Sequence, residues 1–420
     1  MKNLLILIIC VTLSLSSCAY LPNDIDNTKN TLSLYDEIPK ETQKSFGEER
    51  TLAMWISQYD IALMCLKDGN PRSVDEYHSR VSLMVARLLS LGINTIFVQT
   101  RPNGDSLYHS DIFPPSAYAS GELGVACKYD TFGIIVDQAV QANISVHAWI
   151  NPLRLMKASE IHKMDKKYTL GKWAQNFMGT RIVTVGEYCY LDPAYPEVRR
   201  LITDGAIEIM EKYAVDGIHI DDYFYPTVSP DFDADSYSLF GKGTSLGDFR
   251  RSNITQLVSE LHSAAAPRGR IFGISPSGNS KRNYDELYAD IEEWCKRGVI
   301  DYLCPQIYFG IEHETFPFEK TVQEFYRVCN ENGIYMIVGL TLEKAQNGFD
   351  GTVDIYAGSG KNEWIDNKDV LARCADIAIS LGCDGLAFFS YRLFYSPSSF
   401  SENEATREER DALFEFLKMG

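Results

Sequence analysis

The chain has 420 residues, with 57 Asp and Glu against 40 Lys and Arg, and a formal net charge of −17. At 45% hydrophobic and 12% aromatic residues it can bury a large core, which excludes disordered and fibrous classes. The acidic total argues against a nucleic-acid partner, because phosphate contacts need clustered Lys and Arg, and it favours a neutral or weakly charged ligand.

The N-terminal segment is typical of a targeting signal. An apolar run at 4–15 follows a positive residue and is too short to cross a bilayer, but it suits a signal peptide. Small residues before Cys18 resemble the bacterial lipobox, so we expect cleavage there and lipidation of that thiol; the alternative is an ordinary secretory signal. We predict a signal peptide over 1–18, a polar tether over 19–47 and a folded domain over 48–420. The protein is then a lipoprotein of the bacterial cell envelope, facing the periplasm or exposed on the surface.

Short apolar runs alternate with segments of helical periodicity along the rest of the chain. The predicted strands are 52–56, 94–99, 144–150, 217–221, 271–275, 302–308, 335–340 and 385–390. The predicted helices are 79–91, 132–141, 198–213, 249–266, 284–296, 322–332, 369–381 and 404–417. This alternation predicts an α/β fold, a closed (β/α)₈ TIM barrel with loop insertions. An open doubly wound sheet is the rival, but no Gly-rich phosphate turn follows the first strand.

Polar and aromatic side chains crowd the predicted strand ends, where the active site of such a barrel lies. The strand bodies are apolar, so a purely structural barrel does not need these residues. Aromatic rings can cover the apolar faces of sugars while polar groups bind the hydroxyls, and the set therefore suits a carbohydrate. The residues interpreted as substrate-binding are Arg101, Asp105, His147, Trp149, Asn151, His219, Gln306, Tyr308 and Tyr391.

Some of these interpretations have alternatives. Arg101 and Asp105 can pair with each other instead, and Trp149 can fill the barrel instead of stacking on a sugar. The Lys-rich insertion at 157–191 is either a wall over the cleft or a solvated loop.

Asp221 and Asp222 follow the fourth predicted strand and are the candidate catalytic pair. Cleavage of a glycosidic bond needs an acid for the leaving oxygen and a second group that stabilises or attacks the oxocarbenium-like centre. Adjacent carboxylates repel each other, which raises one pKa. We predict that Asp222 is the general acid and that Asp221 is the nucleophile or, on an N-acetylated sugar, orients the 2-acetamido group. Asp105, Asp192 and Glu187 are the alternative acids.

No cofactor or metal site is predicted. The ten cysteines form no CxxC pair, and no histidine stands at zinc-finger spacing. Most cysteines lie in apolar runs, which favours buried thiols. The alternative is that one or two disulfides form, as in other exported proteins. His147 and His219 have no third ligand at a recognisable spacing, so we interpret both as hydrogen-bonding to sugar or to Asp221.

Several ordered motifs carry a resemblance to a known family. They are RPNGDSLY at 101–108, HAWINP at 147–152, YLDP at 190–193, YAVDGIHIDDYFYP at 213–226, GISP at 273–276 and PQIY at 305–308. In this order they resemble the glycosyl hydrolase-like family ten. The resemblance implies a (β/α)₈ barrel with glycosidase activity, often in bacterial lipoproteins. For some members it implies action on peptidoglycan glycan that has lost its stem peptides.

The fourth strand also resembles the DGxDxDxE pattern of the family-18 chitinases. Asp216, Gly217 and Asp221 match, whereas His219 replaces the first Asp of the triad and Tyr223 replaces the acidic Glu. We therefore predict a lipid-anchored, monomeric glycoside hydrolase whose partners are a polysaccharide and the membrane, with no nucleic acid. The missing Glu keeps open a non-catalytic glycan-binding lipoprotein, and a glycosidase for dietary or host glycans is a further alternative.

Overall fold

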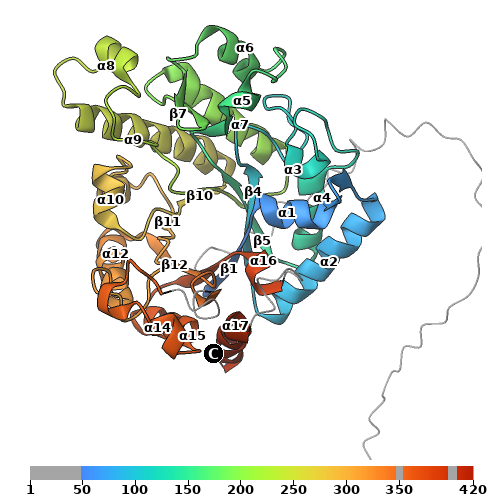
Figure 1. Ribbon diagram of the computed structural model, residues 1–420, viewed down its shortest axis with the longest axis vertical. Coiled ribbons are helices and arrows are strands. Elements are labelled where there is room, and N and C mark those ends of the chain that lie inside the picture. The colour runs from blue at the N-terminus through green and yellow to red at the C-terminus, as the bar shows by residue number, and fades with distance from the viewer. Residues whose placement is uncertain (1–48, 347–352, 396–403, 420) are drawn as a thin grey trace, which may run out of the picture. The chain divides into compact units, whose positions relative to one another are not determined.

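The computed structural model describes residues 49–346, 353–395 and 404–419; the predicted signal peptide, the lipidation site Cys18 and the tether lie outside the described residues. Within this part, eight parallel strands close into a barrel in the order β1, β13, β12, β11, β10, β9, β5, β4 (Figure 1). The barrel strands are Thr51–Ile56 (β1), Thr95–Arg101 (β4), Ser145–Ile150 (β5), Gly217–Ile220 (β9), Ile271–Ile274 (β10), Tyr302–Leu303 (β11), Tyr335–Thr341 (β12) and Gly385–Phe389 (β13). The predicted (β/α)₈ barrel is confirmed.

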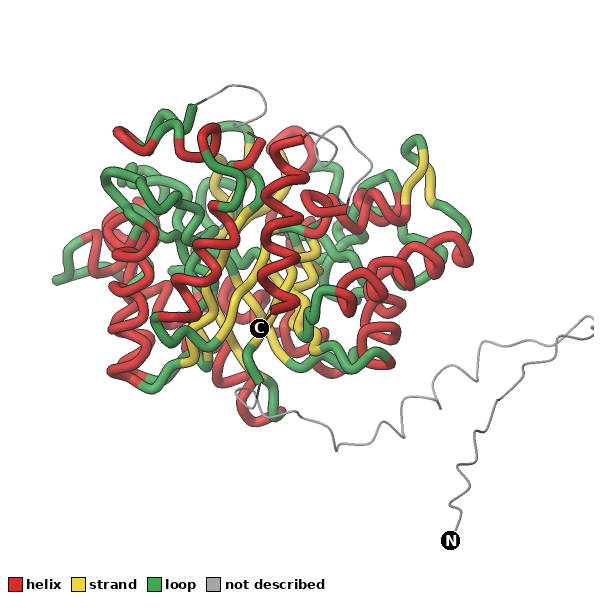
Figure 2. The backbone as a smooth tube through the Cα atoms, turned by 90° about the horizontal axis from the view of Figure 1, so that it is seen from below, coloured by secondary structure: helices red, strands yellow, loops and turns green. Residues whose placement is uncertain are grey.

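Helices surround the barrel strands (Figure 2). Their bounds are Gln58–Cys65 (α1), Val74–Ser90 (α2), Ala117–Ser120 (α3), Thr131–Gln141 (α4), Ala158–Ile161 (α5), Thr169–Asn176 (α6), Pro196–Lys212 (α7), Ala234–Phe240 (α8), Leu246–Ala265 (α9), Ser280–Asp285 (α10), Ile291–Arg297 (α11), Phe318–Asn332 (α12), Glu363–Asp366 (α14), Val370–Ser380 (α15), Tyr391–Tyr395 (α16) and Glu404–Met419 (α17). In α12, buried Phe318, Val322, Phe325 and Cys329 recur at three- and four-residue spacing, which gives the helix one apolar face against the core. No helix in the described ranges is long and apolar enough to cross a membrane.

Two predicted elements differ from the structure. The single helix expected at 284–296 is broken into α10 and α11, because Tyr288 lies in the left-handed region (φ 56°) and the Asp290 side chain caps a new helix start. The strand expected at 302–308 is reduced to β11, because Pro305 has no N–H to donate. Gln306 still bridges the neighbouring strands, so the barrel stays closed there.

An insertion between β5 and α7 forms its own small sheet beside the barrel. Its strands are Arg154–Lys157 (β6), Ile182–Val185 (β7) and Tyr188–Leu191 (β8), paired antiparallel in the order β6, β8, β7. Leu155, Leu170 and Trp173 are buried within it. The segment is therefore an ordered sheet rather than a solvated loop.

Asn or Asp residues placed directly before a strand seal the N-terminal end of the barrel. Asp216 donates its N–H to the carbonyl of Val146 (2.8 Å), and its carboxylate accepts the N–H of the same residue (2.8 Å). The same exchange, which we call an Asx clip, joins Asn94 to Leu52, Asp301 to Phe272 and Asp384 to Met336. The clips therefore link β1 to β4, β5 to β9, β10 to β11 and β12 to β13.

The thiols of the described part are free. Cys65, Cys189, Cys295, Cys304, Cys329, Cys374 and Cys383 are buried and Cys127 is half-buried. Burial raises the pKa of Cys65 to about 12, which keeps it a protonated, apolar group.

Candidate active site

The predicted catalytic pair lies at the C-terminal mouth of the barrel, directly after β9. Asp221 is 3% exposed, and its Oδ2 accepts hydrogen bonds from Trp149 Nε1 (3.0 Å) and Asn151 Nδ2 (2.5 Å). Its Oδ1 accepts from the backbone N–H of Tyr223 (3.2 Å). Trp149 and Asn151 come from the end of β5, the strand paired with β9, so the register of these two strands places both donors.

The electrostatics of the pair favour a protonated carboxyl near neutral pH. Burial and the neighbouring Asp222 raise the pKa of Asp221 to about 8, while its three hydrogen-bond donors oppose this rise. Burial also raises the pKa of Asp222, whereas Arg282 and a hydrogen bond from Gln306 lower it. Near neutral pH Asp221 therefore keeps a proton, which the neighbouring Asp222 favours.

A cavity of about 560 Å³ opens beside Asp222. Its lining residues are Asp222, Ser277, Asn279, Arg282, Gln306, Tyr308, Phe309, His313, Phe316 and Tyr356. Phe309 and Phe316 stack with ring centroids 5.1 Å apart and form part of an aromatic wall. A volume of this size, with aromatic and polar sides and one carboxyl, fits a sugar ring of a small-molecule or polymer ligand.

Of the residues interpreted as substrate-binding, the structure brings Gln306 and Tyr308 to this cavity. Gln306 Nε2 donates to the carbonyl of Ser275 (2.9 Å), which fixes the amide at the mouth. Trp149 and Asn151 lie behind Asp221 and hold it. Because Trp149 is only 6% exposed and packs in the interior cluster of the barrel, it fills the barrel instead of forming a sugar platform.

His147 and His219 lie inside the barrel, away from the cavity. Both are fully buried, and Tyr302 Oη lies 2.9 Å from Nδ1 of His147 and 2.7 Å from Nδ1 of His219. Trp55 Nε1 also donates to Nε2 of His219 (3.3 Å). Burial lowers the pKa of His147 to about 3 and also lowers that of His219, so both are neutral. The expectation that they contact sugar or Asp221 is corrected, because they occupy the layer below the mouth.

Arg101, Asp105 and Tyr391 are also absent from the lining of the cavity. Arg101 is buried over the ring of Phe113 (4.6 Å), and Asp105 accepts the N–H of Asn103 (2.9 Å). Arg101 and Asp105 both lie in the described ranges, and no nitrogen of the guanidinium lies within 4.0 Å of a carboxylate oxygen of Asp105, so the two side chains form no ion pair. The Oη of Tyr391 accepts a hydrogen bond from an arginine on α2 (3.2 Å). All three stabilise the shell of the barrel, so their expected sugar contacts are corrected as well.

The alternative acids do not line the cavity either. Asp192 is buried and accepts a hydrogen bond from Ser236 Oγ (2.6 Å), and Glu187 forms an exposed ion pair with Lys157 (3.2 Å). Within the described part, Asp222 is the carboxylate that faces the cavity.

Sequence reasoning missed most of the aromatic wall and its polar partners. Ser277 is the second residue after the predicted strand 271–275 and Phe309 directly follows the predicted strand 302–308, so their position was the available signal. Phe316, Tyr356 and Arg282 come from loops and a short helix whose spacing carries no pattern that points to the mouth.

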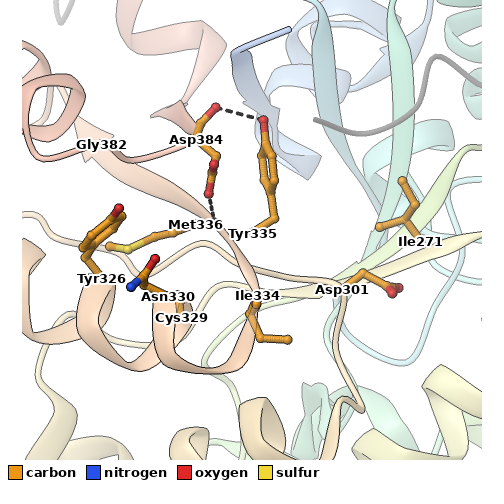
Figure 3. A pocket seen from close by; sticks show the side chains of 11 residues that line it. Ile271, Asp301, Tyr326, Cys329, Asn330, Ile334, Tyr335, Met336, Gly382 and Asp384 are labelled. Carbon is orange, nitrogen blue, oxygen red and sulfur yellow. Dashed lines mark hydrogen bonds between the residues drawn. The ribbon is translucent and has the colours of Figure 1, made fainter. Parts of the chain in front are cut away.

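A second cavity, of about 500 Å³, lies at the opposite, N-terminal end of the strands (Figure 3). Asp384 points to the N–H of Met336, and the Tyr335 hydroxyl donates to the carbonyl of Asp384 (3.0 Å). The carboxyls of Asp301 and Asp384, which line this cavity, form two of the Asx clips. This face of a (β/α)₈ barrel serves stability. In the described ranges, no group of three or more His, Cys, Asp or Glu is placed to hold a metal.

Comparison with known proteins adds to this geometry. Residues 51–350 match the family model described as Glycosyl hydrolase-like 10. The chain is 30% identical over 305 residues to Glycosyl hydrolase YngK of Bacillus subtilis (strain 168), covering 66% of this chain and 58% of that protein. It is 32% identical over 283 residues to Glycosyl hydrolase DigH of Escherichia coli (strain K12), covering 61% and 64%. The chain thus spans less than two thirds of the length of these curated relatives.

Among solved structures, the PgaB (BpsB) glycoside hydrolase domain from Bordetella bronchiseptica has the same fold. The TM-score is 0.52 at 13% identity, covering 87% of this chain and 98% of that one.

Proposed function

Since the chain belongs to the glycosyl hydrolase-like 10 family, we propose that it is a glycoside hydrolase that cleaves a polysaccharide with Asp221 and Asp222. The observation that carries this proposal is the carboxyl pair itself. One carboxyl, that of Asp221, is held by three donors and has a pKa raised to about 8, and the other, that of Asp222, faces an aromatic-walled cavity. Glycoside hydrolysis needs one acid and one ionised partner at the scissile bond.

In the proposed mechanism the proton that the free pair keeps on Asp221 moves to Asp222, the carboxyl that faces the cavity, when the glycan binds. Asp222 then gives this proton to the leaving glycosidic oxygen as the bond to the anomeric carbon breaks. Asp221 is the ionised partner, which either attacks that carbon or orients a 2-acetamido group to attack it. Two N–H donors engage the lone pairs of its Oδ2, whereas a single backbone donor from Tyr223 contacts Oδ1. The oxygen that keeps a lone pair for the reaction is therefore Oδ1. A water then hydrolyses the intermediate, with Asp222 now accepting its proton.

The aromatic wall supplies binding on the cavity side of the pair. Rings of Phe309, Phe316 and Tyr356 can cover the apolar face of a sugar, while Gln306 and Asn279 can bind hydroxyls. Tyr356 is 78% exposed, which leaves its ring open to a ligand.

We further propose that the substrate is the glycan of the bacterial envelope, in particular peptidoglycan strands without stem peptides. The lipobox-like segment that ends at Cys18 supports this location, because a lipid on that thiol would hold a monomeric enzyme at the membrane. A dietary or host glycan is the alternative substrate.

A product assay tests the proposal. Purified full-length protein is incubated with peptide-free peptidoglycan strands and, in parallel, with neutral polysaccharides, and mass spectrometry identifies the fragments. Asp221→Asn and Asp222→Asn should abolish cleavage, whereas Asp376→Asn, an exposed site on α15, should leave it unchanged.

Each outcome assigns a function. Disaccharide-repeat fragments from peptidoglycan would support the envelope substrate. Cleavage of a neutral polysaccharide alone would indicate that the substrate is a dietary or host glycan. Full turnover by both Asn variants would overturn the catalytic assignment. Binding without cleavage by the unmodified protein would make it a glycan-binding lipoprotein, the reading that the missing chitinase-type Glu keeps open.

A further inference from the structure

A cation lies next to the catalytic pair on the side away from the cavity. The guanidinium of Arg154, at the start of β6, lies over the rings of Tyr188 (4.9 Å) and Tyr223 (4.8 Å). We call these three residues the Tyr–Arg–Tyr stack. Tyr223 also donates its backbone N–H to Asp221, so the stack adjoins the reacting carboxyl directly.

The stack and the cavity flank the end of β9. The cavity is built from the loops after β10, β11 and β12, whereas the stack comes from β6, β8 and the residues just after β9. In the barrel order β9 lies between β10 and β5, and β6 follows β5 in the chain. A polymer bound across Asp221 and Asp222 would therefore contact the cavity on one side and the stack on the other.

The charge of Arg154 is oriented by the two rings and has no ion-pair partner in the described ranges, although the Asp221 carboxylate acts on it from further away and contributes to its raised pKa. Its buried Nε has no hydrogen-bond partner, and in the described ranges no acidic side chain lies within 4.0 Å of the guanidinium. Arg250 shows the contrast, because its fully buried guanidinium is paired with Asp233 (2.6 Å). Tyrosine rings hold a guanidinium in place and leave its N–H fork free for a planar anion.

The surroundings of the stack are basic although the chain is acidic. Between residues 154 and 191 there are seven Lys and Arg against three Asp and Glu, whereas the whole chain carries −17. Tyr223 is 42% exposed, so this flank is open to a ligand. A local positive field attracts an anionic polymer and raises its concentration at the site.

We propose that the Tyr–Arg–Tyr stack is a sugar subsite that binds a carboxylate on the substrate, with Arg154 as the specificity-determining residue. The inference rests on the proposed hydrolase function and narrows its substrate class to acidic glycans. Arg154 donates two N–H groups to the carboxylate, and Tyr223 offers its ring to the same sugar.

Paired substrates that differ only in the carboxylate test the proposal. One is peptide-free peptidoglycan strands, and the other is the same strands with their carboxyl groups reduced to alcohols. The unmodified enzyme should have a kcat/KM about tenfold to a hundredfold higher on the carboxylated strands. Arg154→Gln should lose that preference through a higher KM on the carboxylated strands and keep the rate on the reduced ones. Arg154→Lys, which keeps the charge without the fork, should retain part of the preference.

A matched control separates the stack from general charge. Lys166→Gln removes one exposed cation from the same insertion and should keep the full preference. An equal loss by Arg154→Gln on both substrates would show that Arg154 only holds the insertion in place, and the proposal would be overturned. So would an unmodified enzyme that does not distinguish the two substrates.

Binding measurements keep this inference apart from the hydrolase proposal. Calorimetry on the unmodified protein and on Asp222→Asn should show tighter binding of carboxylated strands, and Arg154→Gln should abolish the difference. If this preference is found without any cleavage, the subsite stands and the hydrolase proposal falls. If neutral polysaccharides are cleaved and Arg154→Gln has no effect, the hydrolase stands and the acidic subsite falls.

Discussion

Arg250 on α9 anchors the loop that follows the catalytic pair, and breaking its ion pair should destabilise the whole barrel. Its Nε and Nη2 donate to the two carboxylate oxygens of Asp233 (2.8 and 2.6 Å), and both side chains are fully buried. The remaining N–H groups donate to the carbonyls of Thr227 (3.1 Å) and Ser229 (2.6 Å) and to the hydroxyl of Tyr288 (3.0 Å). Every donor of the guanidinium is therefore used.

The change Asp233→Asn keeps the shape of the side chain and leaves the cation of Arg250 buried without its counter-charge. Removing one partner of such a pair costs about 3–5 kcal/mol. An unfolding entropy of about 2.1 cal/mol/K per residue over roughly 370 residues makes each kcal/mol worth about 1.3 °C, so we expect Tm to fall by about 4–6 °C.

Thermal unfolding followed by circular dichroism at pH 7 measures this shift. The control is Glu211→Gln, which breaks the exposed ion pair between Arg268 and Glu211 (3.1 Å) and should cost less than about 1 kcal/mol. The rate of glycan cleavage by Asp233→Asn should also be lower than that of the unmodified protein, even at temperatures well below the Tm of the variant, because the loop behind the catalytic pair loses its anchor. A Tm for Asp233→Asn within the range of the control would refute the reasoning.

Three further predictions follow from the site and the core. Because burial and Asp222 raise the pKa of Asp221 to about 8, kcat/KM should fall as pH rises through about 8, where the carboxyl pair loses its last proton. A profile of kcat/KM that stays flat to pH 10 would contradict this protonation of the pair. Asn151→Ala removes a donor to Asp221, and kcat should fall about tenfold to a hundredfold with little change in Tm; an unchanged kcat in steady-state assays would show that this donor is dispensable. Glu409 on α17 is buried against two N–H groups of α15, and burial raises its pKa to about 7. Because this folded-state pKa lies above the unfolded value, stability should decline as pH rises from about 4 to 7, and Glu409→Gln should flatten that slope in Tm measured against pH.

The barrel was predictable because its strands are buried on both faces. Continuous apolar runs such as 335–340 mark such strands clearly, and all eight were found, seven with small errors at their ends and β11 predicted five residues too long. Errors arose where a single residue changes the backbone: Pro305 ends the ladder of β11, and Tyr288 interrupts a helical pattern. The sheet of the insertion was not resolved into strands, because its short segments alternate too briefly to give a period.

The candidate site was only partly predictable, because a strand end has two layers of inward-facing residues. Asp221 lies at the mouth, whereas His219, two residues earlier on the same face of the strand, lies in the closed layer below. Both are polar, and the sequence does not tell which layer is open to solvent. Phe316 and Tyr356 reach the mouth from long loops, and the geometry of those loops depends on packing that no local pattern encodes.

The Asx clips divide the barrel into quarters. Each clip closes one pair of consecutive strands, and the joints between pairs carry no clip in the described ranges. The repeating unit is thus two strands with their helices, present four times with the same polar lock at the same end. A unit of this kind suits growth by gene duplication, since each added copy brings its own lock and joins its neighbours through an ordinary parallel strand ladder. The same division indicates where the chain tolerates circular permutation. New termini placed between two quarters leave the two strands of every Asx clip connected in the chain. New termini within a quarter disconnect the two strands that one clip joins.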